Sequence, residues 1–402
     1  MHVEENIMYA EDCLFFKYDR PCIYHKKFSD KCVCNNYRKI KKDILIIKLD
    51  ALGDVFRTMS ILKPLKKKYP ESSVSWVTRQ NALPLFKNIE HVDEVLEYRE
   101  TYLLHTLLSK KFSIVFNPDS SLASMRLATI VNADEKIGYY FNSGNKINFS
   151  NSIASKWFYM GINDELKKNN SLTYQKYIFE MLNIEYKKDS IPIVLSQDEL
   201  DYKHKFIEDK NVDHSRKIVG LNIGASGRWK YKSWLFEYYI ELIKLILSKT
   251  NYQALVLGGP EEVDKIKQLN EVFGEKLIYS GSNNPLRHFF AILDICNVVV
   301  SADTMAAHAA LALNKKLVAI FGPTSFNEFE DYNRTIKFYA DIDCLVCYKS
   351  DCDKNGLCMK EINYKDVFEA VNVLAHDGFR GCDMIKGELA FFTSKKDPNR
   401  CR

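Results

Sequence analysis

Four short segments of this 402-residue chain carry the glycines, cations and carboxylates from which a ligand site could be built. The first is Asp50-Ala51-Leu52-Gly53-Asp54, which follows the apolar run 43–49. Gly53 permits a tight turn from a strand into a helix, and the helix dipole would stabilise a carboxylate at Asp54. Aspartate is also a favoured N-cap residue. Asp54 is therefore either a charged group that faces a cleft or only a helix cap.

The second segment, 222–234, begins as Asn222-Ile223-Gly224-Ala225-Ser226-Gly227 and continues with three cations in five residues, Arg228, Lys230 and Lys232. Backbone N–H groups and cations together form an anion site, and phosphate is the usual anion. The alternative is an ordinary basic loop. A strand before the segment and a helix after it favour the anion site.

The third and fourth segments also follow apolar runs. Ser301-Ala302-Asp303-Thr304 leads into a predicted helix with His308 one turn further on, and small residues there would let a ligand approach the backbone. Asp303 and Thr304 could again be only a cap, and a lone histidine is commonly a packed core residue. The fourth segment, Gly322-Pro323-Thr324-Ser325, combines a rigid turn with two hydroxyl groups.

The elements that must position these segments form two successive series of strands and helices. Short apolar runs typical of buried strands occur at 43–49, 74–77, 92–96 and 112–116, and again at 217–222, 254–257, 277–279, 297–300 and 317–320. Amphipathic helices are predicted at 55–69, 122–131, 173–182 and 233–247, and after Gly258-Gly259-Pro260, with a linker at 189–196. This alternation predicts an α/β protein with two parallel sheets and right-handed crossovers. Ligands bind at the carboxyl ends of such strands, where all four segments stand.

In their order and spacing these segments resemble those of glycosyltransferase family 9, the heptosyltransferases. The matching stretches are 44–54, 220–234, 257–262, 298–308 and 318–325, and the resemblance covers about residues 43–375. It implies the GT-B fold, in which two Rossmann-like domains face each other across a cleft. We predict a cysteine-bearing extension at 1–42, an acceptor domain at 43–190, a donor domain at 191–375 and a tail at 376–402.

The resemblance implies transfer of heptose from ADP-heptose, with inversion and without a catalytic metal, to a lipopolysaccharide core or related glycan. Asp54 matches the general base of the family, and Lys232 matches the lysine that neutralises the donor diphosphate. The other residues predicted to bind the donor are Gly224, Arg228, Gly259, Glu261 (or Glu262), Asp303, Thr304, His308 and Thr324. The chemistry is consistent, because negative charge grows on the leaving diphosphate and a lysine with helix N–H groups stabilises it there. Met305 stands where the family has a glycine, and Asp50 where it has a small hydroxyl residue.

Eight of the 11 cysteines fall into two groups. Cys344, Cys347, Cys352 and Cys358 have a spacing that suits a closed tetrahedral zinc or iron site with a structural role. Cys13, Cys22, Cys32 and Cys34 are spaced more loosely. Three interpretations stay open for them: a second metal site, a metal site shared across a fold, or plain buried thiols. A relative that heptosylates autotransporter proteins uses an iron-binding cysteine motif, so a protein is the alternative acceptor.

Composition limits the remaining functions. The net charge is +5, with most of the surplus before residue 43, so the chain lacks a general nucleic-acid footprint. No apolar run reaches the roughly 20 residues of a membrane span, and the acidic start predicts no signal peptide. We expect a cytoplasmic protein that could touch the inner membrane peripherally through its basic N-terminal segment. A nucleotide-dependent oxidoreductase is disfavoured, because neither half has G-x-G-x-x-G after its first strand. A non-catalytic scaffold that binds a sugar nucleotide stays open.

Overall fold

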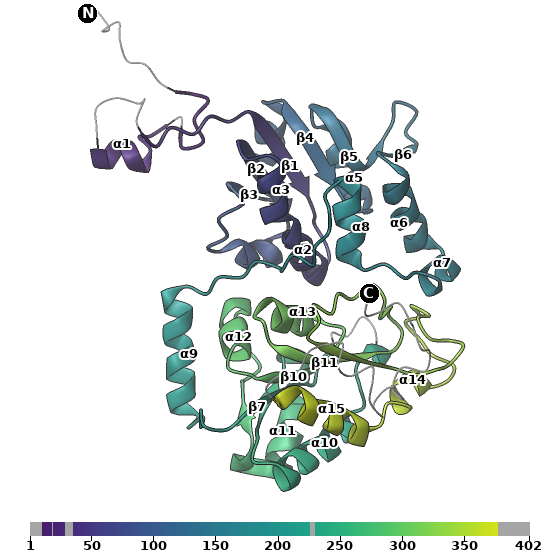
Figure 1. The fold of residues 1–402 in the computed structure, drawn as a ribbon. Helices are drawn as coiled ribbons and strands as arrows, with labels where there is room; N and C mark the ends of the chain where they lie inside the picture. The colour runs from purple at the N-terminus through teal and green to yellow at the C-terminus, as the bar shows by residue number, and fades with distance from the viewer. Residues whose placement is uncertain (1–9, 18, 29–34, 226–229, 377–402) are drawn as a thin grey trace, which may run out of the picture.

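The computed structural model describes residues 10–17, 19–28, 35–225 and 230–376 and contains two six-stranded sheets (Figure 1). The strand orders are β3-β2-β1-β4-β5-β6 and β12-β11-β10-β7-β8-β9. In each sheet the first strand of its half has later strands on both sides, so the direction of the winding reverses beside β1 and beside β7. Ligands bind at such a reversal, outside the carboxyl ends of the strands. The predicted pair of Rossmann-like sheets is confirmed.

The first sheet is parallel except for its last strand, which pairs antiparallel with β5. Its strands are β1 (Lys42–Ile47), β2 (Ser72–Thr78), β3 (Glu94–Glu97), β4 (Phe112–Asn117), β5 (Ala133–Phe141) and β6 (Ile147–Phe149). The helices of this part of the chain are α1 (Ile23–Phe28), α2 (Leu52–Thr58), α3 (Leu62–Lys68), α4 (Leu103–Leu108), α5 (Leu122–Ile130), α6 (Ser152–Ile162), α7 (Asp164–Lys168) and α8 (Tyr174–Met181).

The helix predicted at 55–69 is divided into two. A 3-10 turn at Met59–Ile61 separates α2 from α3. Pro64 explains the division, because its ring nitrogen cannot donate to a carbonyl of the preceding turn and its ring clashes with that carbonyl. As a result α2 is a short helix of seven residues, and it begins at Leu52, earlier than the sequence pattern predicts.

All paired strands of the second sheet are parallel. They are β7 (Ile218–Asn222), β8 (Gln253–Leu257), β9 (Ile278–Tyr279), β10 (Val298–Ala302), β11 (Lys316–Phe321) and β12 (Thr335–Tyr339). The helices of this part are α9 (Gln197–Asp209), α10 (Phe236–Lys249), α11 (Val263–Phe273), α12 (Leu286–Leu293), α13 (Met305–Ala312), α14 (Leu357–Lys360) and α15 (Tyr364–Ala375). Strands β5, β6 and β12 were absent from the sequence prediction. Charged residues interrupt the apolar pattern of β5 and β12, and β6 is only three residues long.

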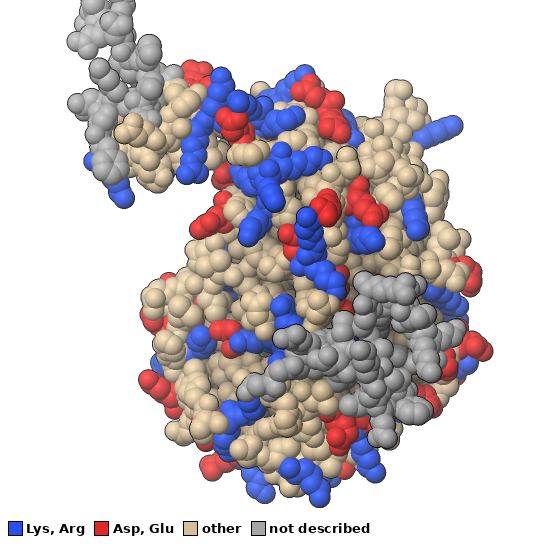
Figure 2. Space-filling model, in the orientation of Figure 1, with Lys and Arg blue, Asp and Glu red and all other residues tan. Residues whose placement is uncertain are grey.

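The two halves touch along one side of a cleft. Helix α2 of the first half packs against α13 of the second, and the rings of Phe56 and Phe290 stack with centroids 5.6 Å apart. The Tyr174 N–H, at the start of α8, donates to the Glu328 carbonyl. Lysines and arginines lie on both halves in the face shown in Figure 2, interspersed with acidic side chains. No helix in the described part of the chain is long and apolar enough to cross a membrane.

Candidate active site

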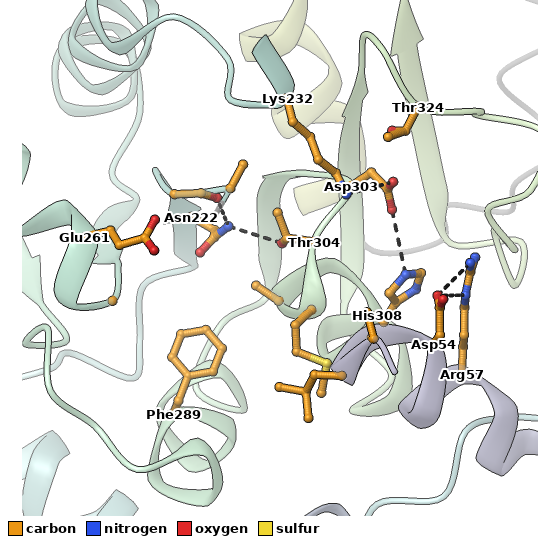
Figure 3. Close-up of a pocket in the computed structure, with 18 of the residues that line it drawn as sticks. Asp54, Arg57, Asn222, Lys232, Glu261, Phe289, Asp303, Thr304, His308 and Thr324 are labelled. Atoms are coloured by element: carbon orange, nitrogen blue, oxygen red, sulfur yellow. Dashed lines mark hydrogen bonds and ion pairs between the residues drawn. The ribbon is translucent and has the colours of Figure 1, made fainter. Parts of the chain in front are cut away.

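A cavity of about 760 Å³ lies between the two halves, and the loops after six strands line it. The strands are β1 in the first sheet and β7, β8, β9, β10 and β11 in the second. Nine of the predicted site residues line this cavity, and Figure 3 shows several of them converging from both walls. They are Asp54, Gly224, Lys232, Gly259, Glu261, Asp303, Thr304, His308 and Thr324. Arg228 lies outside the described residues.

Asp54 lies in the first turn of α2 and is not its cap. Ala51 occupies the N-cap position, and no side chain there bonds to the helix N–H groups. The Asp54 side chain is 37% exposed and pairs with Arg57 one turn along α2, at 2.9 Å from its Nη2 atom. Burial opposes ionisation, but the charges of Arg57 and Lys48 outweigh it and hold the pKa of Asp54 below its ordinary value. Asp54 is therefore an accessible carboxylate that stays charged.

A buried ion pair fixes the turn that presents Asp54. Asp119, after β4, accepts hydrogen bonds from the N–H groups of Leu49 and Asp50 at 3.0 and 3.2 Å. The Lys48 ammonium lies 3.4 Å from the same carboxylate and also donates to the Asp50 carbonyl. Burial alone would lower the pKa of Lys48, yet Tyr174 and Asp119 raise it above its ordinary value. The Asp119 carboxylate thus orients the backbone that leads into α2.

On the opposite wall, the loop after β10 holds a second charged group. Lys232 pairs with Asp303 at 3.2 Å, and His308 Nε2 lies 3.8 Å from the same carboxylate. Burial favours a neutral Asp303, but Lys232, His308 and Arg57 hold its pKa well below the ordinary range. Burial and then the charge of Arg57 lower the pKa of His308 to about 4. His308 is therefore neutral at pH 7, with its ring stacked on Phe329 at 4.8 Å.

The glycine loop after β7 is packed closely against the loop after β8. A Cβ at Gly224 would lie 2.4 Å from the Glu262 carboxylate, so a larger residue there would displace that carboxylate. Glu262 in turn accepts the Gly259 N–H at 2.8 Å. Asn222 donates to the hydroxyls of Ser301 and Thr304 at 3.1 and 3.3 Å, which ties β7 to the loop after β10. Both acidic residues considered from the sequence, Glu261 and Glu262, line the cavity, and Glu262 also braces the two loops.

The structure adds cavity residues that sequence reasoning missed, among them Arg57, Glu328, Tyr348 and Phe289. Arg57 is three residues after Asp54, the spacing at which side chains on a helix meet, so the sequence contained a signal for it. Glu328 and Tyr348 lie on irregular loops whose course only tertiary contacts define.

The C-terminal cysteine group lies on the loop that carries Tyr348 into the cavity. Cys344, Cys347, Cys352 and Cys358 are free thiols and partly buried. Burial, followed by the charges of the other three, raises the pKa of Cys358 to about 11. Within the described ranges, no group of three or more His, Cys, Asp or Glu side chains is arranged to hold a metal ion. Of the N-terminal group, Cys13 and Cys22 are free thiols, and Cys32 and Cys34 lie outside the described residues. Both metal sites stay predictions.

Comparison with known proteins assigns the family. Residues 101–357 match the model of glycosyltransferase family 9 (heptosyltransferase). This chain belongs to glycosyltransferase family 9. It is 22% identical to the lipopolysaccharide core heptosyltransferase OpsX of Haemophilus influenzae, over 76% of this chain and 87% of that protein. It is also 23% identical to lipopolysaccharide heptosyltransferase 1 of Campylobacter coli, over 83% of this chain and 99% of that protein.

Solved structures share its fold. A family 9 glycosyltransferase from Veillonella parvula superposes with a TM-score of 0.69 at 16% identity, covering 84% of this chain and 98% of that one. The ADP-heptose lipopolysaccharide heptosyltransferase II of Escherichia coli gives a TM-score of 0.60 at 17% identity, covering 83% and 98%. The predicted GT-B fold is confirmed. This protein is a glycosyltransferase.

The buried pair under the Asp54 turn makes an asymmetric prediction about stability. Asp119→Asn should lower the free energy of unfolding by about 3–5 kcal/mol, because it leaves the Lys48 ammonium buried without its partner. Lys48→Met should cost less, roughly 1–3 kcal/mol, because the Asp119 carboxylate keeps its backbone N–H donors. Urea unfolding at pH 7 measures both. The matched control is Asp43→Asn, whose pair with Lys110 is over one-third exposed on average and should contribute about 0–1 kcal/mol. Equal losses for the two buried variants would contradict the role given to the backbone donors.

Proposed function

We propose that this protein transfers a heptose from ADP-heptose to a lipopolysaccharide core or related glycan, with inversion at the anomeric carbon. The observation that carries the proposal is that one cavity places Asp54 on one wall and Lys232, Asp303 and Thr304 on the other. The heptosyltransferase relatives support the choice of sugar and acceptor, and a related structure holds ADP-2-deoxy-2-fluoro heptose. A protein acceptor is the alternative.

In the proposed reaction Asp54 is the general base. Its carboxylate takes the proton of the acceptor hydroxyl while that oxygen attacks the anomeric carbon, and the bond from that carbon to the diphosphate breaks with its electron pair on the leaving oxygen. Such proton transfer contributes roughly 10²–10⁴-fold to a rate. Because its pKa is low, the Asp54 carboxylate is ionised at neutral pH and is free of the proton that it must accept.

The donor diphosphate would lie against the loop after β10. The N-terminus of α13, an eight-residue helix, presents its positive end there, which favours an anion. Lys232 supplies a full positive charge, and its contact with Asp303 holds it in place before the donor arrives. Asp303 would repel a phosphate if it were alone, but its neighbours Lys232, His308 and Arg57 offset its charge. We infer that residues 43–190 hold the acceptor and residues 191–375 hold the donor.

We also propose that the enzyme works in the cytoplasm and contacts the inner membrane peripherally when its acceptor is lipid-linked. The basic segment before residue 43 supports this proposal, because such segments are attracted to anionic lipid surfaces.

The donor assignment predicts a clear preference in binding. Native mass spectrometry of the full chain with ADP-heptose, UDP-glucose and GDP-mannose at equal concentration should show a complex mainly with ADP-heptose. The cavity should discriminate by the nucleoside and the sugar together, so ADP alone should bind more tightly than UDP or GDP. Equal occupancy by all three sugar nucleotides would contradict the assignment of ADP-heptose as the donor.

Substitutions on the two walls should have different kinetic effects. Asp54→Asn should lower kcat for heptose transfer by about 10²–10⁴-fold with little change in donor affinity, because it removes the proton acceptor only. Lys232→Met should lower kcat by about 10²–10³-fold and also weaken donor binding, because it removes a charge that stabilises the leaving diphosphate. Asp50→Asn, in the same turn as Asp54 but paired outward with Arg79, is the control and should retain most activity. Full activity in Asp54→Asn would show that another group takes the proton.

For the C-terminal cysteine group we propose a structural zinc or iron that plays no part in the transfer. The support is the spacing of the four thiols, which are partly buried in one loop. When bound, the metal would hold the loop that carries Tyr348. Elemental analysis of the purified chain should find about one metal per protein, and Cys347→Ser with Cys358→Ser should abolish it. Cys296→Ser is the control, since Cys296 is buried in the core. An unaltered metal content in the double variant would disprove this site.

A further inference from the structure

A second carboxyl group enters the cavity from the wall opposite Asp54. Glu328 lies in the loop between β11 and β12 and is buried, yet it lines the same cavity as Asp54 and Arg57. Its carboxylate accepts a hydrogen bond from the Tyr348 hydroxyl at 3.3 Å. Its backbone carbonyl accepts the Tyr174 N–H at 2.9 Å. Glu328 is therefore anchored on both sides at the junction of the two halves.

Arg57 lies in the same cavity as this carboxyl group and pairs with the base Asp54. The Arg57 side chain is 12% exposed, and its guanidinium pairs with Asp54 and lies over the Tyr174 ring at 3.8 Å. Burial alone would lower the pKa of Arg57, but Asp54, Tyr174, Glu328 and Asp303 raise it well above its ordinary value. The guanidinium thus stands among carboxylates from both halves, and Asp54 holds it in the structure described here.

Charged and polar groups from several elements act on Glu328. They are Arg57 and Asp54 of α2, Asp303 of the loop after β10, and Tyr348 of the cysteine-bearing loop. After burial, the Glu328 charge contributes to raising the pKa of Tyr177 in α8. Lys167 lies over the Tyr348 ring, with its Nζ atom 4.3 Å from the ring centroid. Burial raises the pKa of Glu328 to about 7, against the charge of Arg57, and the charges of Asp303 and Asp54 add to this rise. A carboxyl group with this pKa exchanges its proton near neutral pH.

We propose that Glu328 is a positioning residue that competes with Asp54 for the Arg57 guanidinium across the cleft, and that its ionisation frees Asp54 to act as a base. The inference rests on the proposed function of Asp54. While Glu328 is protonated, Arg57 pairs with Asp54 alone and lowers the proton affinity of the Asp54 carboxylate. Once Glu328 is ionised, two carboxylates share one guanidinium, and the added negative charge raises the proton affinity of Asp54.

The pH dependence of transfer tests this coupling. In the wild type kcat should rise as pH increases through about 7, because ionised Glu328 strengthens the base. Glu328→Gln should equal the wild type at pH 6 and be about three- to ten-fold slower at pH 8.5, which is the effect of roughly one pKa unit on a general base. Glu330→Gln is the matched control. Glu330 is buried in the same loop, but its carboxylate bonds to Tyr186 and pairs with Lys188, so this variant should keep the inflection near pH 7.

A structural role would give a different result. If Glu328→Gln slows transfer equally at every pH, or keeps the wild-type profile, the coupling is overturned. The variant should fold, because removing a carboxylate that is costly to bury should leave its melting temperature at pH 8 equal to or above that of the wild type.

A second measurement needs no turnover. In carbon-13 NMR of protein labelled at the glutamate carboxyl, the resonance lost in Glu328→Gln should titrate near pH 7 in the wild type. Asp54→Asn should move that midpoint lower, because a neighbouring negative charge is gone, and Asp50→Asn should leave it in place. A midpoint that Asp54→Asn does not move disproves the coupling, whatever the enzyme transfers. Absence of transfer from every sugar nucleotide together with the expected NMR shift would instead count against the proposed function alone.

Discussion

The Arg57 guanidinium is the positive charge around which carboxylates from both halves are arranged. A buried cation needs partners, because its desolvation is costly. Here Asp54 of α2 pairs with it, and the charges of Glu328 and Asp303, in the loops after β11 and β10, act on it from further away. The ion pair with Asp54 keeps that carboxylate ionised, and the ring of Tyr174 covers the guanidinium. The contact between the two halves is thus built around the charge that also governs the proposed base.

The remaining features of the site serve to hold backbone in place around this centre. Asp119 and Lys48 fix the turn that leads into α2. Glu262 fixes the two glycine loops against each other, and Asn222 ties β7 to the loop after β10. Each of these groups is buried and hydrogen-bonded to other parts of the protein, so the loops on both walls are preorganised before any ligand is present.

The sequence predicted most of the strands, because a parallel sheet covered on both faces needs continuous apolar runs, and these are visible without structure. It failed where that constraint relaxes. Strand β12 carries Lys337, whose ammonium reaches the Phe326 carbonyl, and β5 begins with three charged residues among its first four. The break between α2 and α3 was also missed, although Pro64 was a signal for it.

For the site, the sequence by itself determined which residues follow the carboxyl ends of the strands, and so it predicted nine residues that line one cavity. The physical reason is that strand order and the right-handed crossover bring all such ends to the same edge of a sheet. Only the tertiary structure decided what each group does there. It showed that Asp54 is paired with Arg57 and is not a cap, that Glu262 braces the glycine loops, and that Glu328 and Tyr348 belong to the site. The Asp54–Arg57 pair is local, and its spacing is visible in the sequence. The other assignments depend on burial and on contacts between segments distant in the chain, and no local pattern encodes such contacts.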